Sequence, residues 1–143
     1  MKVKQISIFV ENKSGRLCEV TKALSRQSIN IRALCIADTS DFGILRLIVN
    51  DPAKAMRVLK EEGFTVTTTD IVAAEVPDTP GGLAGVLELL GRHGINIEYM
   101  YAFVGKEKDN AVVVLKMEEI EKAIEVLQEA KVKLLRESEL YKF

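Results

Sequence analysis

The chain contains the same pattern twice. Residues 12–31 align without a gap with residues 78–97, and eight of the 20 pairs are identical, where chance would give about one. Further along the chain an insertion lengthens the second copy, and it falls in the charged, turn-like stretch 105–110. A repeat that spans nearly the whole chain predicts two copies of one small unit, at 1–69 and 70–143.

A unit of about 70 residues has only a marginal core of its own, so two such units gain stability by packing together. No stretch rich in Pro, Gly or Ser separates the copies, and Thr67-Thr68-Thr69-Asp70 marks the expected boundary. We therefore expect the two units to pack rigidly against each other.

Each copy begins with a strand and a helix. Apolar residues alternate over residues 3–10, which predicts a strand. Gly15 then opens a helix in which Leu17, Val20 and Leu24 recur at helical spacing and form its apolar stripe.

The second half of each copy adds two strands, a helix and a last strand. Asp51 and Pro52 are typical of an N-cap and a first helical position, and Gly63 is a typical helix end. The turn between the two strands is predicted at 38–41. The predicted strands are 3–10, 29–37, 44–49 and 64–66 in the first copy and 71–76, 95–104, 111–117 and 132–135 in the second, whose helices are 81–91 and 119–130.

The order β-α-β-β-α-β, with right-handed crossovers, places both helices of a copy on one face of a four-stranded antiparallel sheet. The fold class predicted for each copy is therefore α+β, a ferredoxin-like sandwich, and the chain is two such sandwiches in tandem.

Composition narrows the function classes. The net charge is −1, and neither copy concentrates the basic residues that a nucleic-acid surface needs. No apolar run is long enough for a transmembrane helix, and the first residues lack a signal core, so we expect a soluble, cytoplasmic protein. The two cysteines, Cys18 and Cys35, are expected to be reduced and buried rather than bridged.

Catalytic chemistry has few candidates in this sequence. His93 is the single histidine, and its position before Gly94 predicts that it completes the last turn of a helix. One histidine cannot supply the ligand set of a metalloenzyme, and no nucleophile–base pair is evident. The sequence therefore predicts no catalytic residue, no metal ligand and no cofactor.

The turn between the first strand and first helix is the most promising binding site in each copy. Gly15 and Gly81 let the backbone approach a ligand, and a helix N-terminus offers N–H groups to a carboxylate. Asn12 or Asp78 can hold an ammonium group, so the turn suits a zwitterion. The alternative is that Asn12, Ser14, Asp78 and Thr79 are ordinary helix caps and that Pro80 is an ordinary first helical residue.

A second pair of positions and an aromatic row complete the candidates. Asn30 and Asn96 each lie between two isoleucines, either as a ligand contact or as a tie for the neighbouring turn. Tyr99, Tyr101 and Phe103 alternate on one strand where the first copy has small residues. They either fill the core between the repeats or reshape one of two pockets.

The pattern D-x-P-G-x-L followed by G-I-N-I resembles the ACT domain, a regulatory module of amino-acid metabolism. The second copy carries it in full, in Asp78, Pro80, Gly81, Leu83 and residues 94–97; the first copy departs from it with Asn12, Ser14 and Ser28. The resemblance implies that domains pair side by side into one eight-stranded sheet and bind an amino acid at their interface.

The resemblance also implies which residues touch the ligand. In the first copy they are Asn12, Ser14, Gly15, Arg16, Leu17, Asn30 and Ile31, and in the second copy they are Asp78, Gly81, Gly82, Leu83, Asn96 and Ile97. Because the two repeats use up the chain, the resemblance is to a free-standing pair that regulates allosterically through a partner enzyme or a homodimer.

Three functions remain open from sequence. The first is a non-catalytic sensor that binds an amino acid and regulates a partner in amino-acid metabolism. The second is a structural dimerisation or scaffold module that has lost its ligand. The third, a small enzyme, is disfavoured because the sequence offers no catalytic set.

Overall fold

A computed structural model describes residues 1–38, 41–104 and 109–140. The chain divides into two compact units, Lys4–Thr69 and Asp70–Phe143, the second of which also includes Met1–Val3. The turns predicted at 38–41 and 105–110 lie partly outside the described residues.

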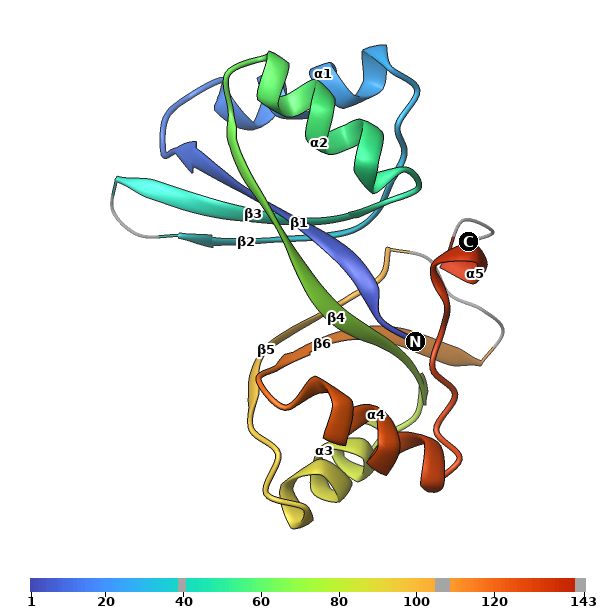
Figure 1. Ribbon diagram of the computed structural model, residues 1–143. Coiled ribbons are helices and arrows are strands. Elements are labelled where there is room, and N and C mark those ends of the chain that lie inside the picture. Colours follow the sequence, from blue (N-terminus) through green and yellow to red (C-terminus); the bar gives the residue numbers. More distant parts are fainter. Residues whose placement is uncertain (39–40, 105–108, 141–143) are drawn as a thin grey trace. The chain divides into compact units, whose positions relative to one another are not determined.

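The first unit has the predicted order of elements. Its strands and helices are β1 (Val3–Glu11), α1 (Arg16–Arg26), β2 (Ile31–Asp38), β3 (Phe42–Val49), α2 (Pro52–Glu61) and the beginning of β4 (Thr65–Pro77). The strands lie in the order β2-β3-β1-β4, and α1 and α2 cover one face of the sheet (Figure 1). This is the strand order of the ferredoxin-like unit predicted from the alternating pattern.

The core of the first unit lies between the sheet and these two helices. Ile6 and Ile8 are fully buried and pair with Leu47 and Leu45 of β3. Leu24 of α1 packs against them, as its spacing predicts. The prediction for Leu17 is corrected: it is 45% exposed, because it lies in the first turn of α1, ahead of the buried stripe.

The second unit repeats this layout with small changes. Its elements are the remainder of β4, α3 (Gly82–Arg92), β5 (Ile97–Ala102), β6 (Asn110–Met117), α4 (Ile120–Glu129) and a short helix, α5 (Glu137–Leu140). The strands lie in the order β4-β6-β5, with α3 and α4 on one face (Figure 1). Irregularities between Ile31 and Ala33 and between Ile97 and Tyr99 occupy matching positions of the two copies, so even local defects of the sheet are repeated.

The described residues form six strands rather than the eight expected, in the hydrogen-bonded order β2-β3-β1-β4-β6-β5. The strands predicted at 64–66 and 71–76 are one continuous strand, β4. The segment Thr67-Thr68-Thr69 does not end this strand, because the β-branched side chain of threonine favours an extended backbone. The strand predicted at 132–135 is reduced to a bridge between Ala74 and Leu134. The predicted eight-stranded sheet is therefore corrected to a six-stranded antiparallel one.

Within the described ranges, no helix is both long and apolar enough to span a bilayer. The aromatic row of the second unit is partly covered: Phe103 is buried, and Tyr99 and Tyr101 are half-buried. Cys35 is half-buried, but Cys18 is exposed, which corrects the prediction that both cysteines are buried.

Candidate functional site

The first strand–helix turn is built alike in both units. Gly15 and Gly81 precede their helices in the left-handed conformation, with φ of 88° and 87°, and no side chain caps either helix. The backbone N–H of Asn12 donates to the carbonyl oxygen of Asp41 over 2.9 Å, and the backbone N–H of Asp78 donates to that of Asp109 over the same distance. The predicted caps are therefore not side-chain caps, and the first-turn N–H groups of α1 and α3 are not used by a capping side chain.

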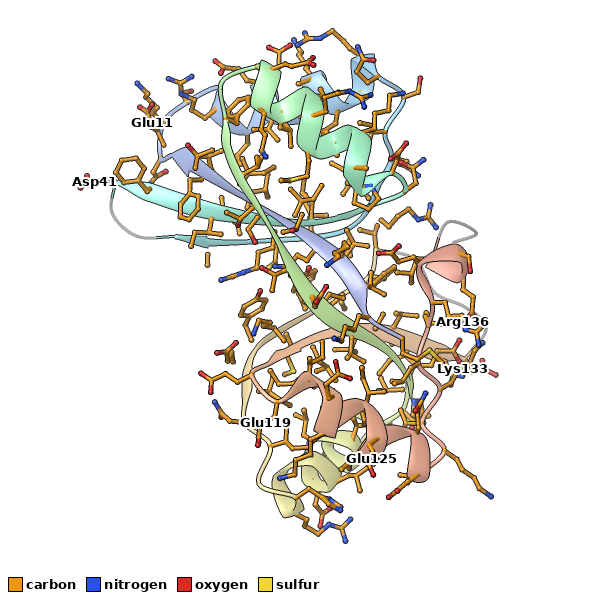
Figure 2. The ribbon with its side chains drawn as sticks, viewed as in Figure 1. Glu11, Asp41, Glu119, Glu125, Lys133 and Arg136 are labelled. Carbon is orange, nitrogen blue, oxygen red and sulfur yellow. The ribbon has the colours of Figure 1, made fainter. Side chains whose placement is uncertain are left out.

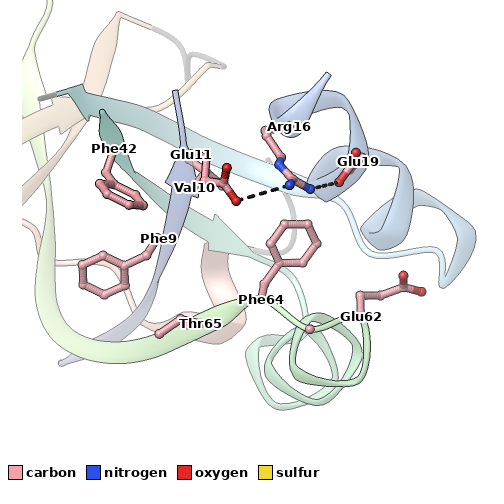
Figure 3. A pocket seen from close by; sticks show the side chains of 10 residues that line it. Phe9, Val10, Glu11, Arg16, Glu19, Phe42, Glu62, Phe64 and Thr65 are labelled. Atoms are coloured by element: carbon pink, nitrogen blue, oxygen red, sulfur yellow. Dashed lines mark hydrogen bonds and ion pairs between the residues drawn. The ribbon is translucent and has the colours of Figure 1, made fainter. Parts of the chain in front are cut away.

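In the first unit, charged side chains cover this turn. Arg16 Nη1 donates to Glu19 Oε2 over 2.9 Å, and its Nη2 donates to Glu11 Oε1 over 3.2 Å (Figure 3). The hydrogen bond from Arg16 to Glu19 is the main cause that raises the pKa of the guanidinium. Lys13, and to a smaller extent Arg16, lower the pKa of the Glu11 carboxyl. A ligand carboxylate that approached Arg16 would have to compete with both glutamates.

In the second unit, the same three places carry no charge. Pro77, Gly82 and Gly85 stand where the first copy has Glu11, Arg16 and Glu19. A Cβ on Gly82 would lie 2.0 Å from the carbonyl oxygen of Pro77, a distance that no side chain tolerates. No charged side chain from these three positions covers the backbone at the start of α3, which is the sense in which it is called bare. The close approach of Pro77 prevents any side chain at position 82.

The predicted asparagines lie at the other end of the first helix of each unit. Asn30 and Asn96 are exposed, next to the half-buried Ile31 and Ile97. Asn30 does help to tie down a turn through its backbone, since its N–H donates to Asn50 Oδ1 over 3.0 Å. Because the 11 residues of α1 span roughly 16 Å, one small ligand cannot contact both the turn and the asparagine of the same unit.

A row of hydroxyls that no sequence motif indicated lies beside Asn30. Thr21, Ser25 and Ser28 line an open groove of about 410 Å³ together with residues 29–31. The equivalents in the second unit are Leu87, Gly91 and Gly94, so the row belongs to the first unit alone. The i, i+4, i+7 spacing on a predicted helix could have revealed it.

A second hollow of the first unit has one aromatic wall and one charged wall. Phe9, Phe42 and Phe64 line a pocket of about 310 Å³, whose other wall holds the Arg16 cluster (Figure 3). Phe9 and Phe42 are 46% and 55% exposed. No motif pointed to this pocket, because it forms where the ends of β1, β3 and α2 meet.

No catalytic arrangement is visible in the residues that the structure describes. His93 Nδ1 lies 3.0 Å from the carbonyl oxygen of Leu89, so the histidine completes the end of α3 as predicted. Within residues 1–38, 41–104 and 109–140, no group of three or more His, Cys, Asp or Glu side chains could hold a metal ion.

Known proteins resemble this chain over its full length. The family described as ACT domain pair matches residues 1–143. The structure of protein BT0572 from Bacteroides thetaiotaomicron is 52% identical, with a TM-score of 0.94, and the match covers 100% of this chain and 98% of that one. The comparison with curated proteins gave no match.

More distant structures share the fold. The regulatory subunits of aspartate kinase from Thermus thermophilus, in its ligand-free form, and from Thermus flavus are 18% and 19% identical, with TM-scores of 0.66 and 0.61. Each match covers 89% of this chain and 91% of the other. With two repeated units, the αL glycine turns and a family match over every residue, the chain belongs to the ACT domain pair family.

Proposed function

We propose that this chain is a non-catalytic allosteric module that binds an amino acid at the turn before α3 and regulates a partner of amino-acid metabolism. The family match and the shared fold with regulatory subunits of aspartate kinase support a regulatory role. The bare helix start at Gly81 and Gly82 is the observation on which the site rests.

The turn suits the two charged ends of an amino acid. The N-terminus of α3 presents backbone N–H groups and the positive end of the helix dipole, both of which attract a carboxylate. Asp78 is exposed at the same turn and offers a negative charge to the ammonium group. Gly81, with φ of 87°, and Leu83 complete the predicted contacts.

The equivalent turn of the first unit is the weaker candidate. Asn12, Ser14, Gly15 and Leu17 belong to this turn and the first turn of α1, but Glu11 and Glu19 hold Arg16 and place negative charge where a carboxylate would bind. We therefore propose that the second unit binds the effector with higher affinity.

Asn30 and Asn96 would contact the ligand only if units associate with one another. Neither can reach the turn of its own unit, so each would contact a ligand only where the turn of another unit, such as one from a second chain, lies beside it. The edge strand β2 supports such pairing, because Leu34 and Ile36 on it are 45% and 49% exposed.

A thermal-shift screen with the twenty amino acids tests the binding, and calorimetry with the variant Asp78→Asn tests the site. A ligand at about 100 times its dissociation constant stabilises by about 2.7 kcal/mol, which moves the midpoint by several degrees. We expect one hit, and an affinity loss of about tenfold or more in Asp78→Asn, since a charge-assisted hydrogen bond is removed.

Glu88→Gln is the matched control, because Glu88 is an exposed carboxylate on α3 outside the turn. An equal loss in both variants would assign the effect to overall charge and reject the site. A flat screen would reject amino-acid sensing.

The scaffold function is the second candidate, and the exposed apolar residues of β2 favour it. If association does not depend on a ligand, the chain should dimerise in the absence of amino acids, and Leu34→Lys with Ile36→Lys should give a folded monomer. Light scattering coupled to gel filtration, with circular dichroism for the fold, separates this outcome from ligand-dependent pairing.

A further inference from the structure

The aromatic wall of the pocket around Phe9, Phe42 and Phe64 is open to a ligand. Phe9 and Phe42 are 46% and 55% exposed, so both rings offer much of their surface. Phe42 pairs with Glu11 across the two strands, and Phe9 precedes Glu11 by two residues, so the three side chains share one face of the sheet. Figure 2 shows Glu11 and Asp41 at this end of the sheet, where the two strands pair.

The opposite wall of the pocket is negative. Its charged side chains are three carboxylates and one guanidinium: Glu11, Glu19, Glu62 and Arg16. From outside the lining, Lys13 pairs with Glu11 over 2.9 Å, and Arg26 lies 3.8 Å from Glu62, both open to solvent. Asp41 adds an exposed carboxylate beside the pocket. The whole cluster holds four carboxylates and three cations, a net charge of −1, and the part that lines the pocket has a net charge of −2.

The fold does not require this combination of aromatic and acidic side chains. Counted by the repeat, the residues of the second unit at the three phenylalanine positions are not aromatic: Glu75, Asn110 and Val132. Because the rings of Phe9 and Phe42 are half exposed, they bury less apolar surface than core residues do. Adjacent accessible apolar side chains with a polar rim are typical of a binding surface.

A quaternary ammonium group matches both walls. Its positive charge is attracted to the faces of aromatic rings. It carries no N–H group and needs no free hydrogen-bond acceptor, so the pairing of Glu11 and Glu19 with Arg16 does not prevent their attraction for it. The volume of about 310 Å³ lies at the lower end of the range for small-molecule sites, roughly 300–1,000 Å³.

We propose that this pocket binds a small quaternary ammonium compound, with its methyl groups against Phe9 and Phe42 and its charge facing the glutamates. Figure 3 shows the two elements of this site, the phenylalanine rings and Arg16 with its two glutamates. The inference goes beyond the proposed function and does not rest on it, since it concerns another ligand class and the other unit.

Choline and neohexyl alcohol test this proposal, because they differ only in the charged nitrogen, which is a neutral carbon in the alcohol. In an amide-resolved NMR titration of the full chain, choline should shift the backbone amides of Phe9, Phe42 and residues 62–65. The alcohol should bind about fivefold more weakly or worse, because it fills the same space without a charge. An amino acid that shifts residues 78–83 would support the proposed function whatever choline does, so the two proposals can fail separately.

Variants then assign the two walls. Phe42→Leu keeps an apolar side chain without the aromatic face, so it should weaken choline binding about fivefold and affect the alcohol less, whereas Phe42→Tyr should retain choline. Glu19→Gln should weaken choline about threefold and leave the alcohol unchanged, because only choline is charged. Tyr101→Leu removes a ring of β5 outside the pocket and should leave choline affinity unchanged. Circular dichroism checks that each variant is folded.

Any of three results would overturn the proposal: no saturable shift with choline at these residues, equal binding of the alcohol, or wild-type choline affinity in both Phe9→Leu and Phe42→Leu. Binding to phosphatidylcholine vesicles without binding of free choline would also overturn it, in favour of a lipid surface. A dimer that forms without choline and that Phe42→Leu converts into a monomer would assign the aromatic wall to a contact between copies instead. Light scattering measures that outcome.

Discussion

The two units share a backbone and differ in what that backbone displays. Both begin their first helix with a left-handed glycine, and both repeat the same irregularity in the following strand. Yet the turn of the first unit is covered by Arg16 with its two glutamates, while that of the second is bare at Gly82. The comparison shows that hydrogen bonds and buried apolar positions preserve a repeated fold, whereas exposed positions diverge in charge.

The largest expected effect tests whether the two cores are equivalent. Leu24 and Leu90 hold the same place in the two copies, and both are fully buried. Leu24→Ala and Leu90→Ala should each lower the free energy of unfolding by about 3 kcal/mol, since a large buried side chain is replaced by a cavity. Urea denaturation measures this, and a difference of more than about 2 kcal/mol between the two variants would break the equivalence.

The next effect concerns the two turns. Gly82→Ala should destabilise the protein by about 3 kcal/mol, because the new methyl group meets the backbone carbonyl of Pro77. Arg16→Ala at the equivalent place should change stability little, since its ion pairs are open to solvent. The same urea titration compares them. A tolerated Gly82→Ala would mean that the turn can shift and is not rigidly bare.

Substitutions just after the second helix of each unit should change the free energy of unfolding by a smaller amount, and in opposite directions in the two units. Lys131→Gly should stabilise the protein by about 1 kcal/mol, and Gly63→Ala should destabilise it by a similar amount, because φ is positive at both positions. Thermal unfolding of both variants would show it. If Lys131→Gly were destabilising, the Lys131 side chain would contribute to folding by more than its backbone strain costs.

The smallest effect is a pH dependence confined to the first unit. Lys13 and Arg16 lower the pKa of Glu11 below its ordinary value of 4.5, so the stabilisation is present above that value and is lost as the pH falls through the lowered pKa. Glu11→Gln should remove this acid-side loss, whereas Glu88→Gln should not. NMR titration of the Glu11 carboxyl gives the direct reading, and an unshifted midpoint would contradict the pairing with Lys13 and Arg16.

Sequence patterns predicted the helices better than the strands. Asp51 caps α2 as its position implies, its carboxylate accepting from the Lys54 amide over 3.1 Å. The residues that form a helix cap are close together in the sequence, so the pattern can be recognised within one short segment. The merging of two strands into β4 was missed because polar threonines were interpreted as a boundary, although their β-branched side chains favour a strand.

The sequence allowed the backbone conformation of the turns to be predicted, but not which charged side chains would meet there. Gly15 and Gly81 indicated the left-handed turns, because few other residues adopt that conformation. The Arg16–Glu11 pair joins a strand end to a helix start, and the pocket around Phe42 joins three separate segments. Contacts of this kind depend on tertiary packing, which residue spacing does not encode.

The close approach of Pro77 to Gly82 also limits how the protein can evolve. Position 16 accepts a long side chain, so single substitutions there can retune the charge and reach of the first turn. Position 82 accepts none, so the second turn can change its selectivity only through residues around it. The same place in the repeat is thus open to side chains of many sizes in one unit and closed to any side chain in the other.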